Sequence, residues 1–462
     1  MKTYQLLSLM LFLSVGIAYS QCPTFNIELN SQAEIDNFAL TYPNCTQLTN
    51  ELRIDGESGF INNLNGLSVI IKAEDIFILK TQINDLSGLD NLIDVKSLTL
   101  WFNNNIQNLE GLSSLENIVR LEMFINNSLV DLSGMTSVQT LENINLFEND
   151  NLISLSHLGF ITSINSFSIG GNAINSLSGL ENLETVTGDF LVSNELMENF
   201  NDLTNLQSID GSLYITNNSN VLDISALDNV ESLADLYIIN CSNLQNFSGL
   251  ENLTTVTGKL RIGFNPEITN LSFIKNIVSV GYLDIYENEN LQTLQGIESI
   301  KHIEHRLFIE SNPSLTTIEA LNYMELPSSI DEIGIINNSS LEVCSNDFIC
   351  SVIDNDDVTK YFVNNAQGCN SVEEVQESCD LSFTDIYIDD LVDIYPNPAS
   401  DDITITLDNS INLKNTLIYS TLGKMVFETQ KNHIDISTYK AGVYYARIIT
   451  DKGAVFRKIV KE

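Results

Sequence analysis

Histidine side chains are the first residues to consider for catalysis, because imidazole commonly serves as a general base or a metal ligand near neutral pH. The chain has four of them. His157 lies in an apolar stretch, which indicates a structural role. His302 and His305 flank Glu304 near a predicted turn, which favours exposed turn residues over a metal pair. The sequence contains no G-x-S-x-G, H-E-x-x-H or phosphate-binding glycine loop. We therefore expect no enzyme and no catalytic residue.

Carboxylates offer a second possible chemistry, since Asp and Glu are abundant. The runs Glu148-Asn-Asp150 and Glu287-Asn-Glu289 place oxygen ligands close together, and calcium takes about six to eight such oxygens. Neither run matches the EF-hand loop or the glycine-rich calcium repeat, so adventitious binding is favoured over a built site. A pair of catalytic carboxylates stays open on sequence alone. We predict no metal site and no cofactor.

These residues are carried by a repeat that fills most of the chain. One unit begins at Phe167 and reads FSIGGNAINSLSGLENLETVTG, and the next begins at Phe190. Every step between Leu98 and Leu283 is 23 or 24 residues, and a fixed period of about 20 to 30 residues is typical of a solenoid. The first apolar residues of the successive units, here called rungs, are Leu52, Ile76, Leu98, Leu121, Ile144, Phe167, Phe190, Leu213, Leu236, Leu260, Leu283, Leu307 and Ile333.

Each rung opens with two apolar residues around one outward residue, and this alternation predicts a short half-buried strand. An asparagine such as Asn103 or Asn126 usually follows five residues after the first apolar one. We expect its side chain to bond backbone groups of neighbouring rungs at a tight bend. In the rung of Leu236 this position holds Cys241, which we interpret as a buried, unpaired ladder residue. The remaining apolar residues are spaced by three, which favours turns and short extended segments over α-helix.

Six further cysteines bracket the repeat. A solenoid end leaves apolar core facing water, so a stapled cap is expected there, and seven cysteines fit an oxidising compartment. The four cysteines beyond the repeat allow three connectivities, and they include no C-x2-C pair, which argues against zinc. We favour the pairs Cys22–Cys45, Cys344–Cys369 and Cys350–Cys379.

The formal net charge of −40 is concentrated before Leu391, where 53 of the 61 Asp and Glu but only 12 of the 21 Lys and Arg lie. No Lys or Arg occurs between Arg120 and Lys259. Such a field repels phosphate backbones and anionic membranes, which argues against nucleic-acid binding, and it attracts cations or a basic partner. A highly soluble extracellular surface is the simpler interpretation.

The first residues read as an export signal, with Lys2 before a short apolar core and Ala18-Tyr19-Ser20 as a cleavage site. No other apolar run is long enough to span a membrane, so the mature chain is not expected to be transmembrane. The caps are predicted to contain a strand at 25–29 and helices at 31–40, 345–355 and 371–379. The predicted parts are a signal peptide (1–20), an N-terminal cap (21–51), a solenoid of about 13 rungs (52–343), a Cys-rich C-terminal cap (344–380), a linker (381–390) and a small β-sandwich (391–462).

The repeat resembles a known module. Residues 251–266, ENLTTVTGKLRIGFNP, are similar to the receptor L domain, the leucine-rich β-helical module of growth-factor receptor ectodomains. The resemblance covers residues 50–345. It implies a mainly β fold, a leucine-rich-repeat-like right-handed β-solenoid, and recognition of a protein or glycan, without naming the ligand.

The tail resembles the type A sorting domain of the Bacteroidetes type IX secretion system. That resemblance implies export by the type IX machinery as a partner, with tail removal and release or surface attachment; a functional domain of the mature protein is the competing interpretation. The matching residues are Tyr395, Pro396, Asn397 and Pro398, Gly423 within STLGK, the run Ile434-Asp-Ile436, Gly442 within AGVY, and the terminal KIVK.

The strands also predict a working surface. If the two apolar residues of a rung point inward, the residues after them point outward and form columns across the rungs. Exposed apolar patches mark interaction surfaces, whereas cross-strand aromatic pairs also stabilise sheets by about 0.2–1 kcal/mol each. We therefore predict a surface protein that binds a glycan, peptide or protein; a structural spacer of the cell envelope is the alternative, and an enzyme a distant third. The candidate ligand-binding aromatics are Phe77, Trp101, Phe124, Phe147, Tyr214, Tyr237, Tyr286 and Phe308.

Overall fold

The structure is a computed structural model that describes residues 22–245, 247–325, 330–389, 391–408, 411–421, 424–451 and 453–462. The predicted signal peptide and Gly423 lie outside these residues. The chain forms two compact units, residues 1–289 and 290–462. None of the helices in the described ranges is long and apolar enough to cross a membrane.

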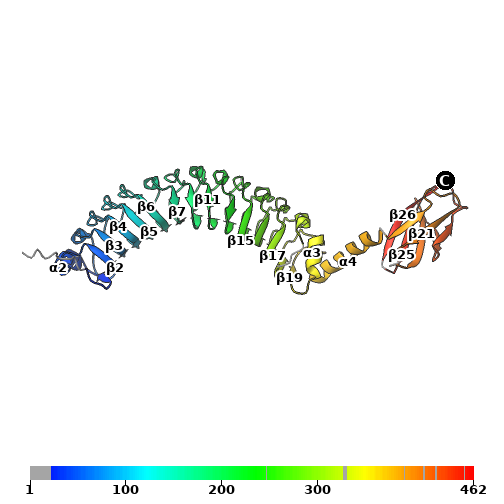
Figure 1. The fold of residues 1–462 in the computed structure, drawn as a ribbon, viewed down its shortest axis with the longest axis horizontal. Coiled ribbons are helices and arrows are strands. Elements are labelled where there is room, and N and C mark those ends of the chain that lie inside the picture. The colour runs from blue at the N-terminus through cyan, green and yellow to red at the C-terminus, as the bar shows by residue number, and fades with distance from the viewer. Residues whose placement is uncertain are drawn as a thin grey trace, which may run out of the picture. The chain divides into compact units, whose positions relative to one another are not determined.

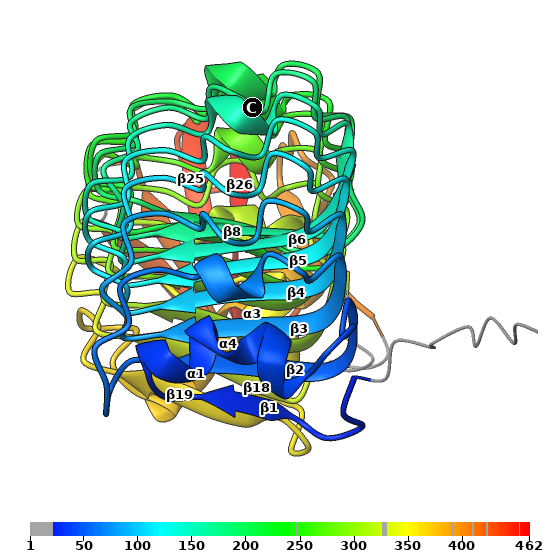
Figure 2. The ribbon, with the colours of Figure 1, turned by 90° about the vertical axis from the view of Figure 1, so that its left-hand side faces the viewer.

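The first unit is a stack of rungs in which each rung adds one strand to a parallel sheet (Figures 1 and 2). The strands form because apolar residues alternate with polar ones, and in β4 both Leu98 and Leu100 are fully buried. The sheet contains, in order, β1 (Ile27–Leu29), β2 (Gln47–Asp55), β3 (Lys72–Leu79), β4 (Asp94–Trp101), β5 (Asn117–Phe124), β6 (Thr140–Phe147), β8 (Ser166–Gly170), β10 (Phe190–Ser193), β12 (Leu213–Thr216), β14 (Leu236–Ile239), β15 (Thr255–Gly263) and β16 (Ser279–Tyr286).

The register of this sheet confirms the one predicted from the repeat. From β2 to β16, the first apolar residue of each rung pairs with the first apolar residue of the next, beginning with Leu52 and Ile76 and ending with Leu260 and Leu283. A slip by one residue would turn every buried side chain outward. The buried column therefore fixes which side chains form the outer face of the sheet.

The rest of each rung contains turns and short extended segments, as the three-residue spacing predicts, and several rungs also contain a short 3-10 helix, which the sequence did not predict. At one corner the backbones of neighbouring rungs approach closely: Gly134 has φ 109°, and a Cβ there would lie 2.1 Å from the carbonyl oxygen of Leu109. The short strands are β7 (Ser163–Ile164), β9 (Thr185–Val186), β11 (Ser208–Ile209) and β13 (Ser232–Leu233), and the 3-10 helices are η1 (Asn65–Leu67), η2 (Ser156–Leu158), η3 (Asn201–Leu203), η4 (Ser225–Leu227) and η5 (Ser272–Ile274).

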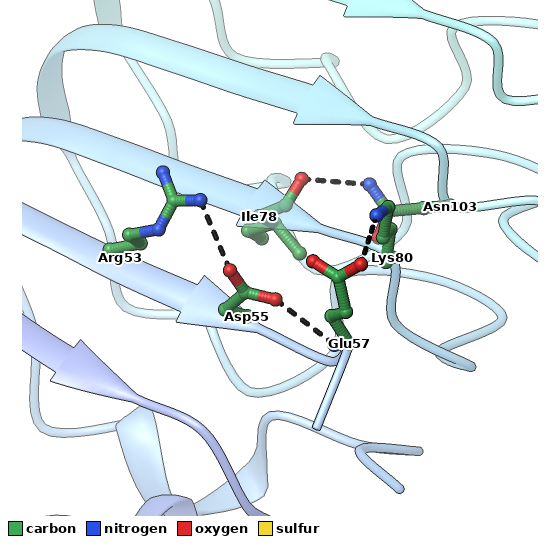
Figure 3. A network of polar contacts seen from close by, with 6 residues as sticks. All are labelled: Arg53, Asp55, Glu57, Ile78, Lys80 and Asn103. Atoms are coloured by element: carbon green, nitrogen blue, oxygen red, sulfur yellow. Dashed lines mark hydrogen bonds and ion pairs between the residues drawn. The ribbon is translucent and has the colours of Figure 1, made fainter. Parts of the chain in front are cut away.

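At most of the bends that follow the strands, a left-handed residue precedes a buried asparagine. Phe102, with φ 56°, donates its N–H to the carbonyl of Phe124 in the next rung at 2.9 Å. Asn103 then donates from Nδ2 to the carbonyl of Ile78 in the preceding rung at 2.9 Å (Figure 3), and its N–H donates to Oδ1 of Asn126 at 3.1 Å. The first unit repeats this ladder with buried Asn103, Asn126, Asn149, Asn172, Asn194, Asn218, Asn265 and Asn288.

Asn194 was missed by the sequence pattern, which placed Glu195 at this position. The rung of Phe190 is one residue shorter at its bend, because Asn194 follows the strand directly and no left-handed residue precedes it. The ladder is nonetheless continuous. The N–H of Asn172 donates to Oδ1 of Asn194 at 2.7 Å, and the N–H of Asn194 donates to Asn218 at 2.9 Å.

Cys241 takes an asparagine position in the same ladder, as predicted. It is buried and free, its N–H donates to Oδ1 of Asn265 at 3.0 Å, and its Sγ lies 3.4 Å from the carbonyl oxygen of Ile215. Burial raises the pKa of the Cys241 thiol to about 12. Because the thiolate is the reactive form, we expect this cysteine to be unreactive near neutral pH.

The N-terminal cap closes the first unit with two helices, α1 (Gln32–Asp36) and α2 (Phe38–Thr41), where one was predicted. Ser31 is the N-cap of α1, and its side chain accepts a hydrogen bond from the N–H of Glu34. Asn37 then separates the two helices. A disulfide joins Cys22 to Cys45, the pair expected from the sequence.

The second unit begins with a parallel sheet of β17 (His302–Glu310), β18 (Glu332–Ile336) and β19 (Thr359–Val363), with η6 (Glu319–Tyr323). The sequence pattern ended the solenoid before β19, but this strand adds a rung inside the cap. There Asn365 extends the ladder, since its Oδ1 accepts from the N–H of Asn338 at 2.9 Å.

The C-terminal cap contains α3 (Asp347–Ile353) and α4 (Val372–Asp389). Disulfides join Cys344 to Cys369 and Cys350 to Cys379, which are the favoured pairs. Residues 381–389, predicted as a linker, continue helix α4. Their acidic composition indicated an extended linker, yet they contain no Pro or Gly that would end a helix.

Two antiparallel sheets form the C-terminal domain, in the orders β20-β21-β24 and β23-β22-β25-β26 over the described residues. Ile403 of β21 and Ile448 of β25 belong to one buried cluster, so the two sheets share a core in the predicted sandwich. The strands are β20 (Val392–Tyr395), β21 (Asp402–Leu407), β22 (Leu413–Ser420), β23 (Met425–Thr429), β24 (His433–Asp435), β25 (Gly442–Thr450) and β26 (Ala454–Lys461).

The ladder makes a prediction about Cys241. In Cys241→Asn, a carboxamide replaces a weakly bonding thiol at a position that accepts asparagine in the other rungs. We expect the variant to be more stable by about 1 kcal/mol in urea unfolding. The control Cys241→Ala should lose stability, and a Cys241→Asn variant less stable than the parent would contradict the ladder.

Candidate functional site on the aromatic face of the parallel sheet

The outer face of the first unit's sheet contains a row of aromatic rings on β3 to β6. The Phe77 and Trp101 ring centroids are 5.1 Å apart, and those of Trp101 and Phe124 are 6.3 Å apart, both in edge-to-face geometry. The backbone register places Trp101, Phe124 and Phe147 opposite one another on consecutive strands. The structure thus brings these predicted residues together.

Trp101 is the most exposed ring of this row, with 38% of its surface accessible, although it lies between two other rings. Phe102 joins the row from the left-handed bend, with its ring 5.7 Å from that of Phe124. Sequence reasoning missed Phe102 because only strand positions were assigned to columns. A second aromatic at the same bend, Phe264 beside Tyr286, follows the same pattern.

These rings surround an open hollow of about 470 Å³, which we call the apolar hollow. Its volume lies in the range of small-ligand and side-chain pockets, about 300–1,000 Å³. Its floor and walls are rigid, because every lining residue belongs to a paired strand or to the bend that follows it. The lining residues are Trp101, Phe102, Glu122, Met123, Phe124, Asn145 and Phe147.

Three of the predicted aromatics pack over glycines of neighbouring strands. A Cβ added to Gly170 would lie 2.5 Å from the Phe147 ring, and one added to Gly263 would lie 2.4 Å from the Tyr286 ring. In the second unit, Phe308 covers Gly334 in the same way. Rings that cover strand glycines stabilise a sheet. Phe147, Tyr286 and Phe308 therefore have a clear packing role, whereas Trp101 covers none of the described strand glycines.

The remaining predicted tyrosines form a separate pair. Tyr214 and Tyr237 stack with centroids 4.6 Å apart and an interplanar angle of 13°. The Arg261 guanidinium lies 5.9 Å from the Tyr237 ring centroid, and its Nε lies 2.8 Å from a carboxylate oxygen of Asp284. Burial raises the pKa of Tyr237 above its usual value. This pair lies on other strands than the Trp101 row, so the eight candidates do not form one site.

A second hollow of about 550 Å³, here called the acidic hollow, adjoins Phe147. Phe147 lines both hollows. The carboxylates of Glu148, Asp150 and Glu195 belong to its lining, and Gly170 and Gly171 leave space in it. The sequence had singled out the run Glu148-Asn-Asp150 only as a weak calcium candidate.

No histidine of the described residues lines either hollow. His302 and His305 are exposed, but they lie in strand β17 and not in the turn expected from the sequence. Nε2 of His302 is 3.5 Å from a carboxylate oxygen of Glu325, and Nδ1 of His305 is 3.4 Å from Asp331. Among the described residues, no group of three or more His, Cys, Asp or Glu side chains is arranged to hold a metal ion. The outer aromatic face is the surface on which the structure gathers the most candidate residues.

The described part of the sorting motif is held by surface hydrogen bonds within the C-terminal domain. Asn397 donates from Nδ2 to the carbonyl of Lys458 at 2.6 Å, and its Oδ1 accepts from the N–H of Val460 at 2.8 Å. These bonds hold the segment Tyr395–Pro398 against β26. Gly442 opens β25, and Tyr395 is exposed.

Comparison with known proteins identifies the tail. Residues 393–462 match the family described as a secretion system C-terminal sorting domain. The comparison with curated proteins gives no match. Among solved structures, an internalin from Listeria monocytogenes (strain 4b F2365) is similar, with 19% identity and a TM-score of 0.46 over 75% of this chain and 92% of that chain. The tail is thus a type IX sorting domain, and the protein is secreted to the cell surface or beyond it.

Some rings cover glycines and others are exposed, so substitutions at the two kinds of ring should change the free energy of unfolding by different amounts. Gly263→Ala should destabilise the protein by about 1–3 kcal/mol, because the new Cβ collides with the Tyr286 ring. Trp101→Ala should cost less than about 1 kcal/mol. Urea unfolding of both variants measures this difference, and a larger loss for Trp101→Ala would assign that ring to packing.

The sorting-domain match predicts an export defect. Deletion of residues 391–462 should leave the protein in the periplasm, because the signal that the type IX machinery reads is gone. Cell fractionation and surface labelling measure the location. As a control, the tail fused to a periplasmic reporter should bring that reporter to the surface. Normal surface display of the truncated protein would contradict the assignment.

Proposed function

We propose that the mature protein is a recognition protein at the cell surface, which binds a glycan, peptide or protein with the outer face of its solenoid. The observation that carries this proposal is the row of Trp101, Phe124 and Phe147 around the apolar hollow. The row keeps the chain's only tryptophan accessible on the outer face of a sheet, and an exposed apolar patch of this kind is typical of an interaction surface.

The physical properties of the row support recognition. Aromatic side chains bring a large contact area with few rotatable bonds, so little conformational entropy is lost when a partner binds. Edge-to-face contacts with Phe77 and Phe124 hold the Trp101 ring in place before binding. Tryptophan in the centre of such a patch is the residue type that most often dominates binding energy.

A structural spacer without a specific ligand is the second candidate. The rings of Phe147, Tyr286 and Phe308 favour it, because they cover glycines and so stabilise the sheet on which they lie. Catalysis is not part of the proposal: the row offers contact area and no nucleophile. The two candidates differ in whether removal of Trp101 abolishes an interaction.

Arrays of glycans, peptides and proteins probed with the mature protein test the proposal. We expect at least one ligand, and the double variant Trp101→Ala, Phe124→Ala should weaken its binding by about tenfold or more. Tyr214→Ala is the matched control, because it removes an outer-face aromatic that lies outside the row. Unchanged binding by the folded double variant would refute the proposed face.

A further inference from the structure

Phe147 lines both hollows, and the two hollows differ in the side chains that surround them. On one side it lines the apolar hollow with Trp101 and Phe124. On the other side it lines the acidic hollow with Glu148, Asp150 and Glu195. A ligand that crosses this junction meets aromatic rings first and carboxylates next to them.

Gly171 leaves room in the acidic hollow for the carboxylate of Glu148. Gly171 has φ 63°, and the left-handed bend takes other residue types in the other rungs, for example Glu148, Asn217 and Asn240. The backbone conformation alone therefore does not require glycine. A Cβ at residue 171 would lie 2.6 Å from Oε1 of Glu148, so the carboxylate occupies the space that a side chain would fill.

The carboxylates of the acidic hollow have no cationic partner among the residues that the structure describes. Within the described residues, no ion pair is formed by Glu148, Asp150 or Glu195, and no Lys or Arg occurs between Arg120 and Lys259 in the sequence.

Cations elsewhere on this face have acidic partners of their own. Arg53 pairs with Asp55 at 3.0 Å, and Lys80 pairs with Glu57 at 2.6 Å (Figure 3). Arg120 Nε lies 3.7 Å from Glu122. The aromatic row therefore adjoins carboxylates that have no cationic partner among the described residues.

We propose that the partner is a basic polypeptide segment, with an arginine that lies against the Phe147 ring and pairs with the carboxylates of the acidic hollow, while an adjoining apolar side chain enters the apolar hollow. This inference rests on the proposed function. A guanidinium is planar, stacks on aromatic faces and binds carboxylates with two parallel hydrogen bonds, so it fits a ring beside a carboxylate better than a lysine ammonium does. A neutral glycan would use the rings but not the charge.

Short synthetic peptides of varied sequence test this partner, each made also with citrulline in place of arginine, which keeps the shape and removes the charge. We expect the bound peptides to be rich in arginine, citrulline to weaken binding by about tenfold or more, and lysine to be intermediate. Affinity should also fall as salt is added, since salt screens exposed charges.

Matched variants separate a local site from the general negative field. Glu148→Gln, Asp150→Asn, Glu195→Gln should weaken peptide binding by about tenfold or more. The control Glu184→Gln, Asp210→Asn, Glu231→Gln removes the same charge from exposed positions beside β9, β11 and β13 and should change binding by less than about twofold. Equal losses in both would show non-specific attraction and would overturn the inference.

Gly171→Asn supplies a variant that keeps every charge. Asparagine occupies the same bend at Asn217 and Asn240, so the fold should tolerate it, while the new side chain displaces the Glu148 carboxylate and weakens arginine binding. Unchanged affinity in Gly171→Asn would overturn the geometry proposed for the acidic hollow.

The outcomes also distinguish this inference from the proposed function. A ligand lost in Trp101→Ala, Phe124→Ala but insensitive to citrulline, salt and the Glu148 triple variant would overturn the basic partner and keep the aromatic face. A ligand insensitive to both sets of variants would overturn both. Glycan binding alone, without any peptide, would likewise overturn the basic partner.

Discussion

The buried asparagine ladder is the interaction on which the rest of the solenoid depends. At an asparagine bend, the carboxamide accepts from a backbone N–H and donates to a backbone carbonyl of the preceding rung, as Asn103 does with Thr81 and Ile78. Buried backbone groups at a bend lack the partners that a strand would supply, and leaving one unpaired costs about 1–3 kcal/mol. The ladder therefore sets where each strand ends and which residue of each rung lies opposite which.

The strand register aligns side chains of successive rungs and so produces continuous surfaces. Because equivalent residues of successive strands lie opposite one another, Trp101, Phe124 and Phe147 form a row rather than three isolated rings. The same register places Gly170 under Phe147. The left-handed bend adds Phe102 and Glu148 next to the row, so an aromatic surface and a carboxylate surface meet at one edge of the sheet. The proposed binding surface follows from the repetition of the fold.

The sequence predicted most of the fold, because a repeated pattern averages out local ambiguity. The strand register and the burial of Cys241 followed from period and alternation alone, and the three disulfide pairs are those favoured from their positions around the repeat. The pattern failed where one rung departs from the period. Asn194 was missed because its bend is one residue shorter. The strand β19 was missed because the last rung lies among the cysteines of the C-terminal cap and does not follow the repeat pattern. Helix α4 continues through the predicted linker.

The candidate site was only partly predictable for a different reason. A period-two pattern says that a side chain points outward, but not what covers it. Tyr286 and Phe308 read like Trp101 in the sequence, yet their rings lie over glycines of a neighbouring strand, a relation that depends on residues about 23 positions away in the repeat. Gly171 carried no functional signal, since its meaning depends on where the Glu148 carboxylate lies.

Trp101 allows the most direct test of the central claim, because it is the only tryptophan of the chain and lies in the proposed binding surface. Its fluorescence can be followed while ligands found by peptide and glycan screening are added to the mature protein. If the aromatic row is the binding surface, emission from Trp101 should shift or be quenched and should saturate together with binding measured independently. A ligand that binds the mature protein at saturation without any change in Trp101 emission would contradict the account.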